Sequence, residues 1–193
     1  MIVGLTGGIG SGKTTVARLL ETMGSVLYNS DDRAKELYFE TEVKAEVIRL
    51  LGTLSYFEHG GLNKAHISEQ VFSDRDLLQK LNAIIHPAVK KDFTAFTQRN
   101  AGKIIIKESA ILFETGIYKE LEATILVTAP LEQKISRVMK RNAITREEVE
   151  KRMQAQWTDE QKIPLADHVI SNADNEALIP QALTLLEKLH RHA

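Results

Sequence analysis

The sequence contains no cysteine among its 193 residues, which excludes disulfide bonds, a thiol nucleophile and any cysteine-ligated metal site. It also lacks long apolar runs, and none approaches the about 18 residues that a membrane-spanning helix requires. The apolar run at residues 2–5 is too short for the core of a signal peptide. We therefore expect a cytoplasmic protein that contacts no membrane.

Neither sign of charge is in excess, because 25 Lys and Arg residues balance 26 Asp and Glu residues to give a net charge of −1. Without a strong overall field, neither nucleic acid nor an anionic membrane is an expected partner. The hydrophobic fraction of 43% is sufficient for one core. The length predicts a single domain over residues 1–193 that can carry an inserted lobe, and we expect a monomer or a weak homo-oligomer.

The most informative motif is a phosphate-binding loop at residues 7–14, which reads GGIGSGKT. A short apolar run precedes it and a helical pattern follows it, which is the context of a working loop. Glycines allow the backbone to wrap a polyphosphate, Lys13 can reach its β- and γ-phosphates, and the Thr14 hydroxyl can bind Mg²⁺. The predicted nucleotide-binding residues are Gly8, Gly10, Ser11, Gly12, Lys13, Thr14 and Thr15.

Short apolar runs alternate with helical patterns along the rest of the chain. Continuous apolar runs at residues 2–5, 25–28, 103–107, 124–127 and 168–170 are typical of strands buried on both faces of a parallel sheet. Helices between such strands form right-handed crossovers. The sequence therefore predicts an α/β fold of three layers, with a five-stranded parallel sheet at its centre.

Two insertions interrupt this alternation. Roughly 75 residues separate the second and third predicted strands, far more than one crossover needs. Helical patterns at residues 43–51, 76–85 and 88–96 predict an inserted helical lobe over about residues 40–100, which we expect to bind an acceptor substrate. A second, smaller helical pair at about residues 131–157 is rich in arginine and lysine, and we expect it to act as a lid.

The class of phosphate-loop protein follows from what accompanies the loop. The sequence Asn63-Lys64-Ala65-His66 lacks the aspartate of a guanine-reading motif, and the third strand ends with a single carboxylate, Glu108. A small-molecule kinase fits better, because it needs a base for the acceptor hydroxyl, cations over the phosphates and a lid that excludes water. Asp31 follows the second strand at the ligand-binding edge of the sheet and is the candidate base. The same position suits Ser30 or Asp31 as a helix cap, and the sequence leaves this choice open.

Several further segments complete a resemblance that covers nearly the whole chain. The loop is followed by Asn29-Ser30-Asp31, by His86-Pro87, by Leu112-Phe113-Glu114, by the basic run 137–141, by Gln156 and by Val169-Ile170-Ser171-Asn172. In this combination the chain resembles the dephospho-coenzyme A kinase family. The loop alone is shared by many kinases, whereas the His-Pro and Leu-Phe-Glu segments are far more specific.

The resemblance implies transfer of the γ-phosphoryl group of ATP to the ribose 3′-hydroxyl of dephospho-coenzyme A, with Mg²⁺ as the metal. It implies that Asp31 binds and deprotonates the acceptor and that His86 lines the acceptor cleft. Asn172 is implied at the nucleotide, and Glu108 would hold Mg²⁺ through a water molecule. Among the lid arginines we select Arg141 to face the phosphates, because its planar fork suits phosphate oxygens.

Some features remain open at this level. The family pattern Asp-x-Asp is here Asn29-x-Asp31, which leaves one carboxylate. The His86-Pro87 pair can equally end one helix and begin the next, Glu108 can be a surface carboxylate, and the lid arginines can form a solvated helix face. A kinase for another nucleoside or nucleotide is the nearest alternative. A rival of another class is an ATP-dependent switch without an acceptor.

Overall fold

The computed structural model describes residues 1–192. Its contacts divide the chain into two compact units. The first unit comprises Met1–Asn29 and the chain from Asn100 onward, and the second comprises Ser30–Arg99. Among the residues that the model describes, no helix is both long enough and apolar enough to cross a membrane.

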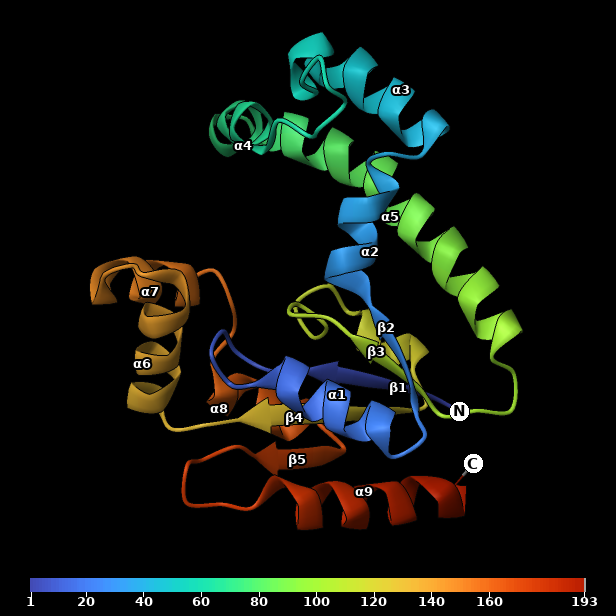
Figure 1. Ribbon diagram of the computed structural model, residues 1–193, viewed down its shortest axis with the longest axis vertical. Coiled ribbons are helices and arrows are strands. Elements are labelled where there is room, and N and C mark those ends of the chain that lie inside the picture. Colours follow the sequence, from blue (N-terminus) through green and yellow to red (C-terminus); the bar gives the residue numbers. More distant parts are fainter. Residues whose placement is uncertain (193) are drawn as a thin grey trace. The chain divides into compact units, whose positions relative to one another are not determined.

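The first unit is built on a parallel five-stranded sheet with the strand order β2-β3-β1-β4-β5 (Figure 1). The strands are β1 (Ile2–Thr6), β2 (Val26–Asn29), β3 (Ile105–Glu108), β4 (Ala123–Thr128) and β5 (His168–Ser171). All pairings between neighbours are parallel. The predicted five-stranded parallel sheet is confirmed, and each predicted strand is found within two residues of its expected bounds.

The helices of this unit follow the strands in the expected alternation. They are α1 (Lys13–Thr22), η2 (Ile117–Glu120), α6 (Leu131–Asn142), α7 (Arg146–Met153), α8 (Asp159–Lys162), η3 (Ile163–Leu165) and α9 (Leu178–His192). The helical patterns predicted after the phosphate-binding loop and within residues 131–157 are therefore confirmed.

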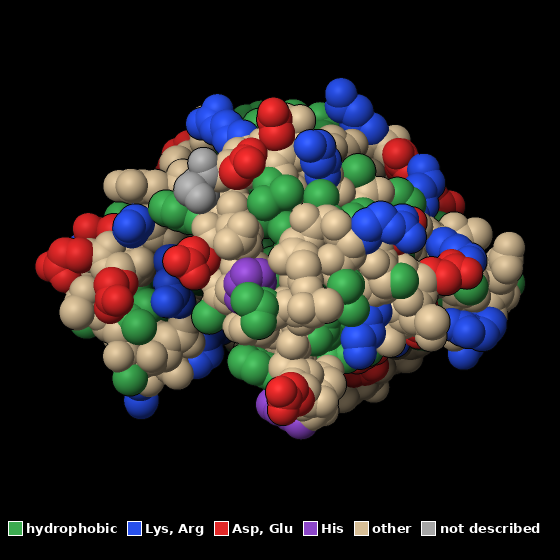
Figure 2. Space-filling view, turned by 90° about the horizontal axis from the view of Figure 1, so that it is seen from above, with side chains coloured by type: hydrophobic (Ala, Val, Ile, Leu, Met, Phe, Trp, Pro, Cys, Tyr) green, Lys and Arg blue, Asp and Glu red, His purple; other side chains and the backbone are tan. Residues whose placement is uncertain are grey.

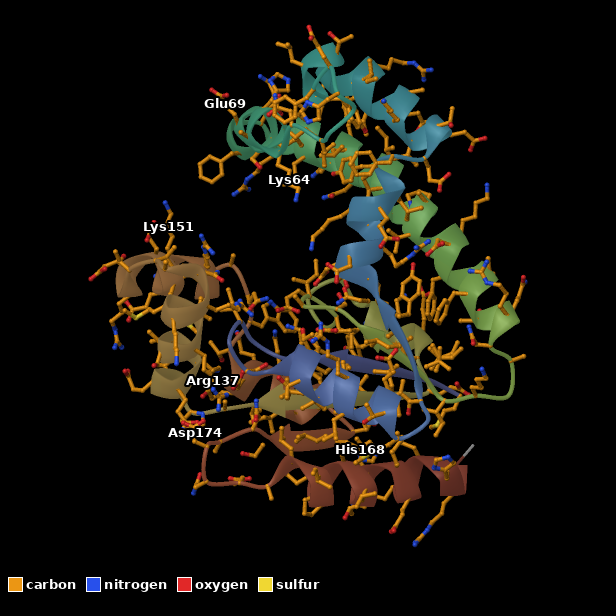
Figure 3. All side chains as sticks on the ribbon, in the orientation of Figure 1. Lys64, Glu69, Arg137, Lys151, His168 and Asp174 are labelled. Atoms are coloured by element: carbon orange, nitrogen blue, oxygen red, sulfur yellow. The ribbon has the colours of Figure 1, made fainter. Side chains whose placement is uncertain are left out.

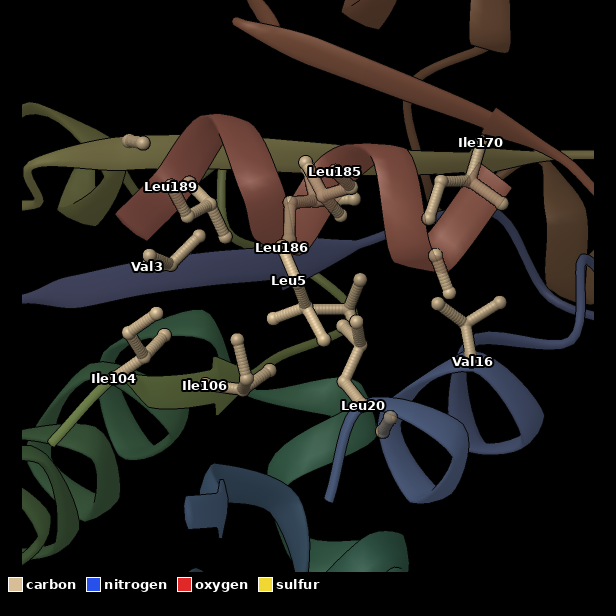
Figure 4. Packing of buried hydrophobic residues seen from close by; sticks show 14 of the residues in the cluster. Val3, Leu5, Val16, Leu20, Ile104, Ile106, Ile170, Leu185, Leu186 and Leu189 are labelled. Atoms are coloured by element: carbon tan, nitrogen blue, oxygen red, sulfur yellow. The ribbon is translucent and has the colours of Figure 1, made fainter. Parts of the chain in front are cut away.

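The main core lies between the sheet and the two helices α1 and α9 (Figure 4). Val3 and Leu5 of β1 are fully buried there against Val16 and Leu20 of α1. The apolar stripe of α9 packs into the same core through Leu185, Leu186 and Leu189. Burial of such side chains contributes about 1.5–3 kcal/mol each, so this core anchors both ends of the phosphate-binding loop.

The opposite face of β1 is covered by the chain that follows β3. Gly4 alternates with Val3 and Leu5, so it faces away from α1 and α9. A side chain at Gly4 would come within 2.6 Å of both Leu112 and Leu121. The absence of a side chain here lets Leu112 pack directly on the strand, where it is fully buried.

Helices α6 and α7 have a small core of their own. Ile135, Val138 and Val149 are buried in it. A capping box begins α7: the Thr145 hydroxyl accepts a hydrogen bond from the Glu148 N–H, and the Glu148 carboxylate accepts one from the Thr145 N–H at 2.8 Å. The pair α6–α7 is therefore a defined local structure and not a loose charged segment.

The second unit is mainly helical, with one isolated antiparallel bridge between Tyr56 and Leu62 among its described residues. It contains α2 (Ser30–Leu37), α3 (Thr41–Leu51), η1 (Thr53–Ser55), α4 (Lys64–Ser73) and α5 (Arg75–Arg99). The helix α4 was not predicted from the sequence. The separate helical patterns on either side of Pro87 predicted a break there, which is wrong, because α5 continues through this proline.

The helix α5 accommodates Pro87 because tertiary packing outweighs the local cost of the missing N–H. Leu81 and Ile85 are buried six and two residues before the proline, in a cluster that they share with Val47 of α3. The ion pair between Arg33 and Asp92 fixes α5 to α2 beyond the proline, with Arg33 Nη2 2.6 Å from Asp92 Oδ1.

Burial raises the pKa of Tyr56 in this unit to about 12.

Charged side chains of both signs are interspersed on the face shown in Figure 2. This distribution agrees with the net charge of −1. It provides no large field of a single sign on that face.

One ion pair in the first unit is deeply buried. Lys162 at the end of α8 is fully buried, and its Nζ lies 2.9 Å from Glu114 Oε1. Burial acts to raise the pKa of the Glu114 carboxyl, but hydrogen bonds from Lys162 and from backbone N–H groups outweigh it and lower this pKa. The pair ties the segment after β3 to the segment before β5.

The Glu114→Ala variant should lose about 3–5 kcal/mol of unfolding free energy, because the Lys162 ammonium would stay buried without its carboxylate. Urea unfolding of the parent and variant at pH 7 measures this loss. The lowered pKa of Glu114 stabilises the fold above the ordinary carboxyl value of 4.5, and this contribution declines as the pH falls through the folded-state pKa. The difference between the two proteins should therefore shrink in acid.

A double variant, Glu114→Leu with Lys162→Met, serves as the control because it removes both charges. It should recover most of the lost stability. A Glu114→Ala protein as stable as the parent at pH 7 would contradict the structural role of the pair.

Candidate functional site

The phosphate-binding loop connects β1 to α1 at the carboxyl edge of the sheet. Gly12 is the N-cap of α1 with φ 89°, and Gly10 has φ 81°. The loop turns back on itself through a hydrogen bond from the Ser11 N–H to the Gly8 carbonyl at 3.0 Å. Positive φ values favour glycine strongly, so this geometry explains two of the glycines in the motif. Lys13, Thr14 and Thr15 follow in the first turn of α1.

Two segments from the C-terminal half approach this loop so closely that no side chain would fit. A Cβ atom at Gly10 would lie 2.4 Å from the Lys134 carbonyl oxygen in α6. A Cβ atom at Gly12 would lie 2.0 Å from the Asn172 side-chain nitrogen. The loop therefore fits between α6 and the segment that follows β5.

A chain of hydrogen bonds connects these two segments. Asn172 donates from Nδ2 to the Ser11 carbonyl at 2.8 Å, and Arg137 of α6 donates from Nη2 to the Asn172 carbonyl at 2.8 Å. Arg137 also pairs with Asp174 (Figure 3), where the two labelled side chains point toward one another. The second guanidinium nitrogen, Nη1, is buried and has no hydrogen-bond partner among residues 1–192.

Glu108 lies at the end of β3, in register with both Leu5 of β1 and Asn29 of β2. Its side chain is buried, with an exposed fraction of 3%. Oε1 accepts a hydrogen bond from the Thr14 hydroxyl at 3.0 Å, and Oε2 accepts one from the Asn29 amide at 3.2 Å. The alternative that Glu108 is a surface carboxylate is therefore wrong.

Arg141 lies in the last turn of α6 and is exposed. Its Nε donates to the side chain of the next residue, Asn142, at 3.1 Å. Arg146, at the start of α7, pairs with Glu132 and Glu150 and so connects α6 to α7. In this structure Arg137, and not Arg141, is the lid arginine that reaches the segment next to the phosphate-binding loop.

The two residues expected at the acceptor both belong to the second unit. Asp31 lies in the first turn of α2, is exposed and accepts no hydrogen bond from the described residues. It is not seen to cap the helix. His86 is exposed and lies within α5, directly before Pro87.

Comparison with known proteins adds independent information. The family model described as dephospho-CoA kinase matches residues 1–177. A dephospho-CoA kinase of Bacteroides fragilis is 37% identical over 191 residues, which cover 98% of this chain and 93% of the relative.

The chain belongs to the dephospho-CoA kinase family.

Solved structures agree with this assignment. The protein TT1252 from Thermus thermophilus has a TM-score of 0.89 at 34% identity and covers 98% of this chain and 97% of its own. The dephospho-CoA kinase from Campylobacter jejuni has a TM-score of 0.73 at 20% identity, covers 99% of this chain and 98% of its own, and supports the fold alone. The fold is that of the P-loop kinases.

The donor set at the end of β3 fits the metal that a dephospho-CoA kinase would use. Thr14 and Glu108 present oxygen atoms 3.0 Å apart, and oxygen ligands are those that Mg²⁺ prefers. Among the described residues no group of three or more His, Asp and Glu side chains could hold a metal by itself.

Several residues next to the phosphate-binding loop were not predicted from the sequence to take part in the candidate site. Lys134 pairs with Asp159 at 2.8 Å beside Gly8, and both side chains are only 12% exposed. Gln156 accepts a hydrogen bond from the Ile9 N–H at 2.9 Å. The resemblance indicated Gln156 without a role, whereas no pattern marked Lys134 or Asp159 among the many charges of this region.

The different positions of Arg137 and Arg141 lead to a testable contrast. Arg137→Ala should weaken ADP binding by about 10-fold or more, because hydrogen bonds from a charged group that position the Asn172 segment are lost. Arg141→Ala should leave ADP binding within about twofold, because among the described residues its exposed guanidinium donates only to the neighbouring Asn142. Isothermal titration calorimetry measures both affinities, with circular dichroism as the test of folding. Equal losses of affinity in the two variants would contradict the contrast.

Proposed function

We propose that this chain catalyses the last step of coenzyme A biosynthesis, the ATP-dependent phosphorylation of dephospho-coenzyme A at its ribose 3′-hydroxyl. The products are coenzyme A and ADP. The observation that carries this proposal is the family match over residues 1–177, and the geometry of the phosphate-binding loop supports it. In chemical terms the enzyme is a phosphotransferase with an alcohol acceptor.

ATP would bind with its phosphates against the loop. Backbone N–H groups of the loop, other than those of Ile9 and Ser11, which are bonded within the protein, and the positive end of α1 would face the phosphate oxygens. Lys13 would stabilise the charge that develops on the β- and γ-phosphates. Thr14 and Glu108 would hold Mg²⁺, with Glu108 acting through a water molecule, and the ion would supply further neutralisation of phosphate charge.

At the acceptor, Asp31 would orient the ribose 3′-hydroxyl and remove its proton as the oxygen attacks the γ-phosphorus. The bond between that phosphorus and the bridging oxygen of ADP breaks in the same displacement. The exposed carboxylate of Asp31, which accepts no hydrogen bond within the described chain, is available for this task. His86 would line the acceptor site in the helical lobe.

A cavity of about 640 Å³ in the second unit does not support an acceptor site. Its apolar floor includes Val43 and Ile84, but Glu40, Glu42 and Glu46 also line it. With Asp92 these are four carboxylates against a single cation, Lys91, and they would repel the phosphates of dephospho-coenzyme A. His86 is not among the residues that line this cavity.

Residues 131–157 would act as the lid. The pair α6–α7 carries arginines and lysines on its surface, and their mutual repulsion would be relieved by bound phosphate. Closure would bring Arg141 toward the phosphates and exclude water that competes with the acceptor. Arg137 and Asn172 would remain on the nucleotide side of the loop.

The reaction itself is testable with an assay that couples ADP release to a panel of acceptors. Dephospho-coenzyme A should stimulate ADP release far above the rate with nucleosides, nucleotides or no acceptor. The Lys13→Met variant should lose about 100-fold or more of this activity, because the lysine contacts charge that grows in the transition state. ADP release that is independent of the acceptor would instead favour an ATP-dependent switch. Preference for another nucleotide would favour a different kinase.

The role of Asp31 is testable separately. Asp31→Asn should retain ATP binding but lower kcat by about 100-fold or more, because an amide cannot accept the hydroxyl proton. Asparagine keeps the ability to begin a helix, so a structural role alone would predict little change. Steady-state kinetics with dephospho-coenzyme A and a thermal melt distinguish the two. If the melting temperature falls while kcat is unchanged, the base assignment is wrong.

A further inference from the structure

The third residue of the phosphate-binding loop is held from outside the loop. The Ile9 N–H donates a hydrogen bond to Gln156 Oε1 at 2.9 Å. The same amide group donates from Nε2 to the Ala110 carbonyl, with a longer distance of 3.4 Å. One side chain thus joins the loop, the end of the α6–α7 region and the segment after β3.

The side chain of Ile9 is held by the same region. It packs against the cluster of Ile135, Val138 and Val149 that forms the core of α6 and α7. Both the backbone and the side chain of Ile9 are therefore occupied by residues that follow β4. A loop fixed in this way needs less ordering when a ligand binds, which favours affinity.

The two partners of Gln156 determine the orientation of its amide. The oxygen faces a donor, the Ile9 N–H, and the nitrogen faces an acceptor, the Ala110 carbonyl. The next residue is anchored as well, since the Trp157 N–H donates to Glu114 at 3.0 Å. Glu114 in turn pairs with the buried Lys162, so Gln156 extends from a rigid support.

We propose that Gln156 is a positioning residue that holds the phosphate-binding loop in the shape that accepts the nucleotide. Its hydrogen bond fixes the orientation of the Gly8–Ile9 peptide next to the turn in which the Ser11 N–H donates to the Gly8 carbonyl, so the loop keeps the shape in which its remaining N–H groups would face the phosphates. Without the bond this peptide can rotate to find water, and the following N–H groups shift with it. The inference depends on the proposed function only in taking ATP and ADP as the ligands of the loop.

The test is the Gln156→Met variant, which keeps the length of the side chain and removes both hydrogen bonds. ADP affinity should fall about 10-fold or more, because small misplacements in such sites have large effects. The KM for ATP should rise while the KM for dephospho-coenzyme A stays within about twofold, since the loop contacts only the nucleotide. If Gln156 only stabilised the fold, the melting temperature would fall without a rise in the KM for ATP relative to the KM for dephospho-coenzyme A.

Gln154→Met is the matched control, because Gln154 lies two residues earlier on the same segment and is exposed. It should bind ADP as the parent does. Calorimetry with ADP requires no acceptor, so it tests the role of Gln156 even if the acceptor proves not to be dephospho-coenzyme A. ADP affinity of Gln156→Met equal to that of Gln154→Met would overturn the proposal.

A measurement on the unaltered protein covers the case in which Gln156→Met does not fold. The Ile9 amide should exchange slowly with solvent in the nucleotide-free protein, because its hydrogen is bonded to Gln156. Amide exchange resolved by NMR reports this residue directly. Exchange of Ile9 at the rate of an exposed loop amide would show that the hydrogen bond does not hold the loop, and would likewise overturn the proposal.

Discussion

The close approach of two distant segments to the phosphate-binding loop is the constraint on which much of the first unit depends. The Lys134 carbonyl and the Asn172 amide lie where a Cβ atom of Gly10 or Gly12 would be. The positive φ values of the loop strongly favour glycine, α6 can approach this closely only because Gly10 has no side chain, and the Asn172 amide fills the space that a Cβ atom of Gly12 would take. Loop conformation and the packing of the C-terminal half are thus mutually required.

The sheet was predictable from sequence because buried parallel strands have a simple signal, a short continuous apolar run. The helix α5 was not, because the local rule at His86-Pro87 disfavours a continuous helix. Burial of Leu81 and Ile85 and the ion pair of Arg33 with Asp92 outweigh that rule. Helix boundaries at proline therefore depend on contacts that are far apart in sequence.

Within the candidate site, the sequence predicted which residues belong to the site better than it predicted which side chains contact one another. Thr14 was expected from the loop motif and Glu108 from the family resemblance, and the register of β1 with β3 places the two side by side. The choice among lid arginines had no comparable basis, since a basic run gives no direction for any one side chain. The structure gives Arg137 the contacts to Asn172 and Asp174, which depend on how β5 lies beside β4.

The difference from the family pattern at Asn29 has a physical explanation in these contacts. The Asn29 amide donates to Glu108 at 3.2 Å, whereas an aspartate at this distance would place two carboxylates together and raise the pKa of one of them. The amide instead donates a hydrogen bond, so Asn29 satisfies one oxygen of Glu108 while the Thr14 hydroxyl satisfies the other. Asparagine at position 29 therefore leaves Glu108 as the one carboxylate among these three side chains. Two neutral donors thus join the ends of β2 and β3 to the first turn of α1, with no second negative charge buried beside Glu108.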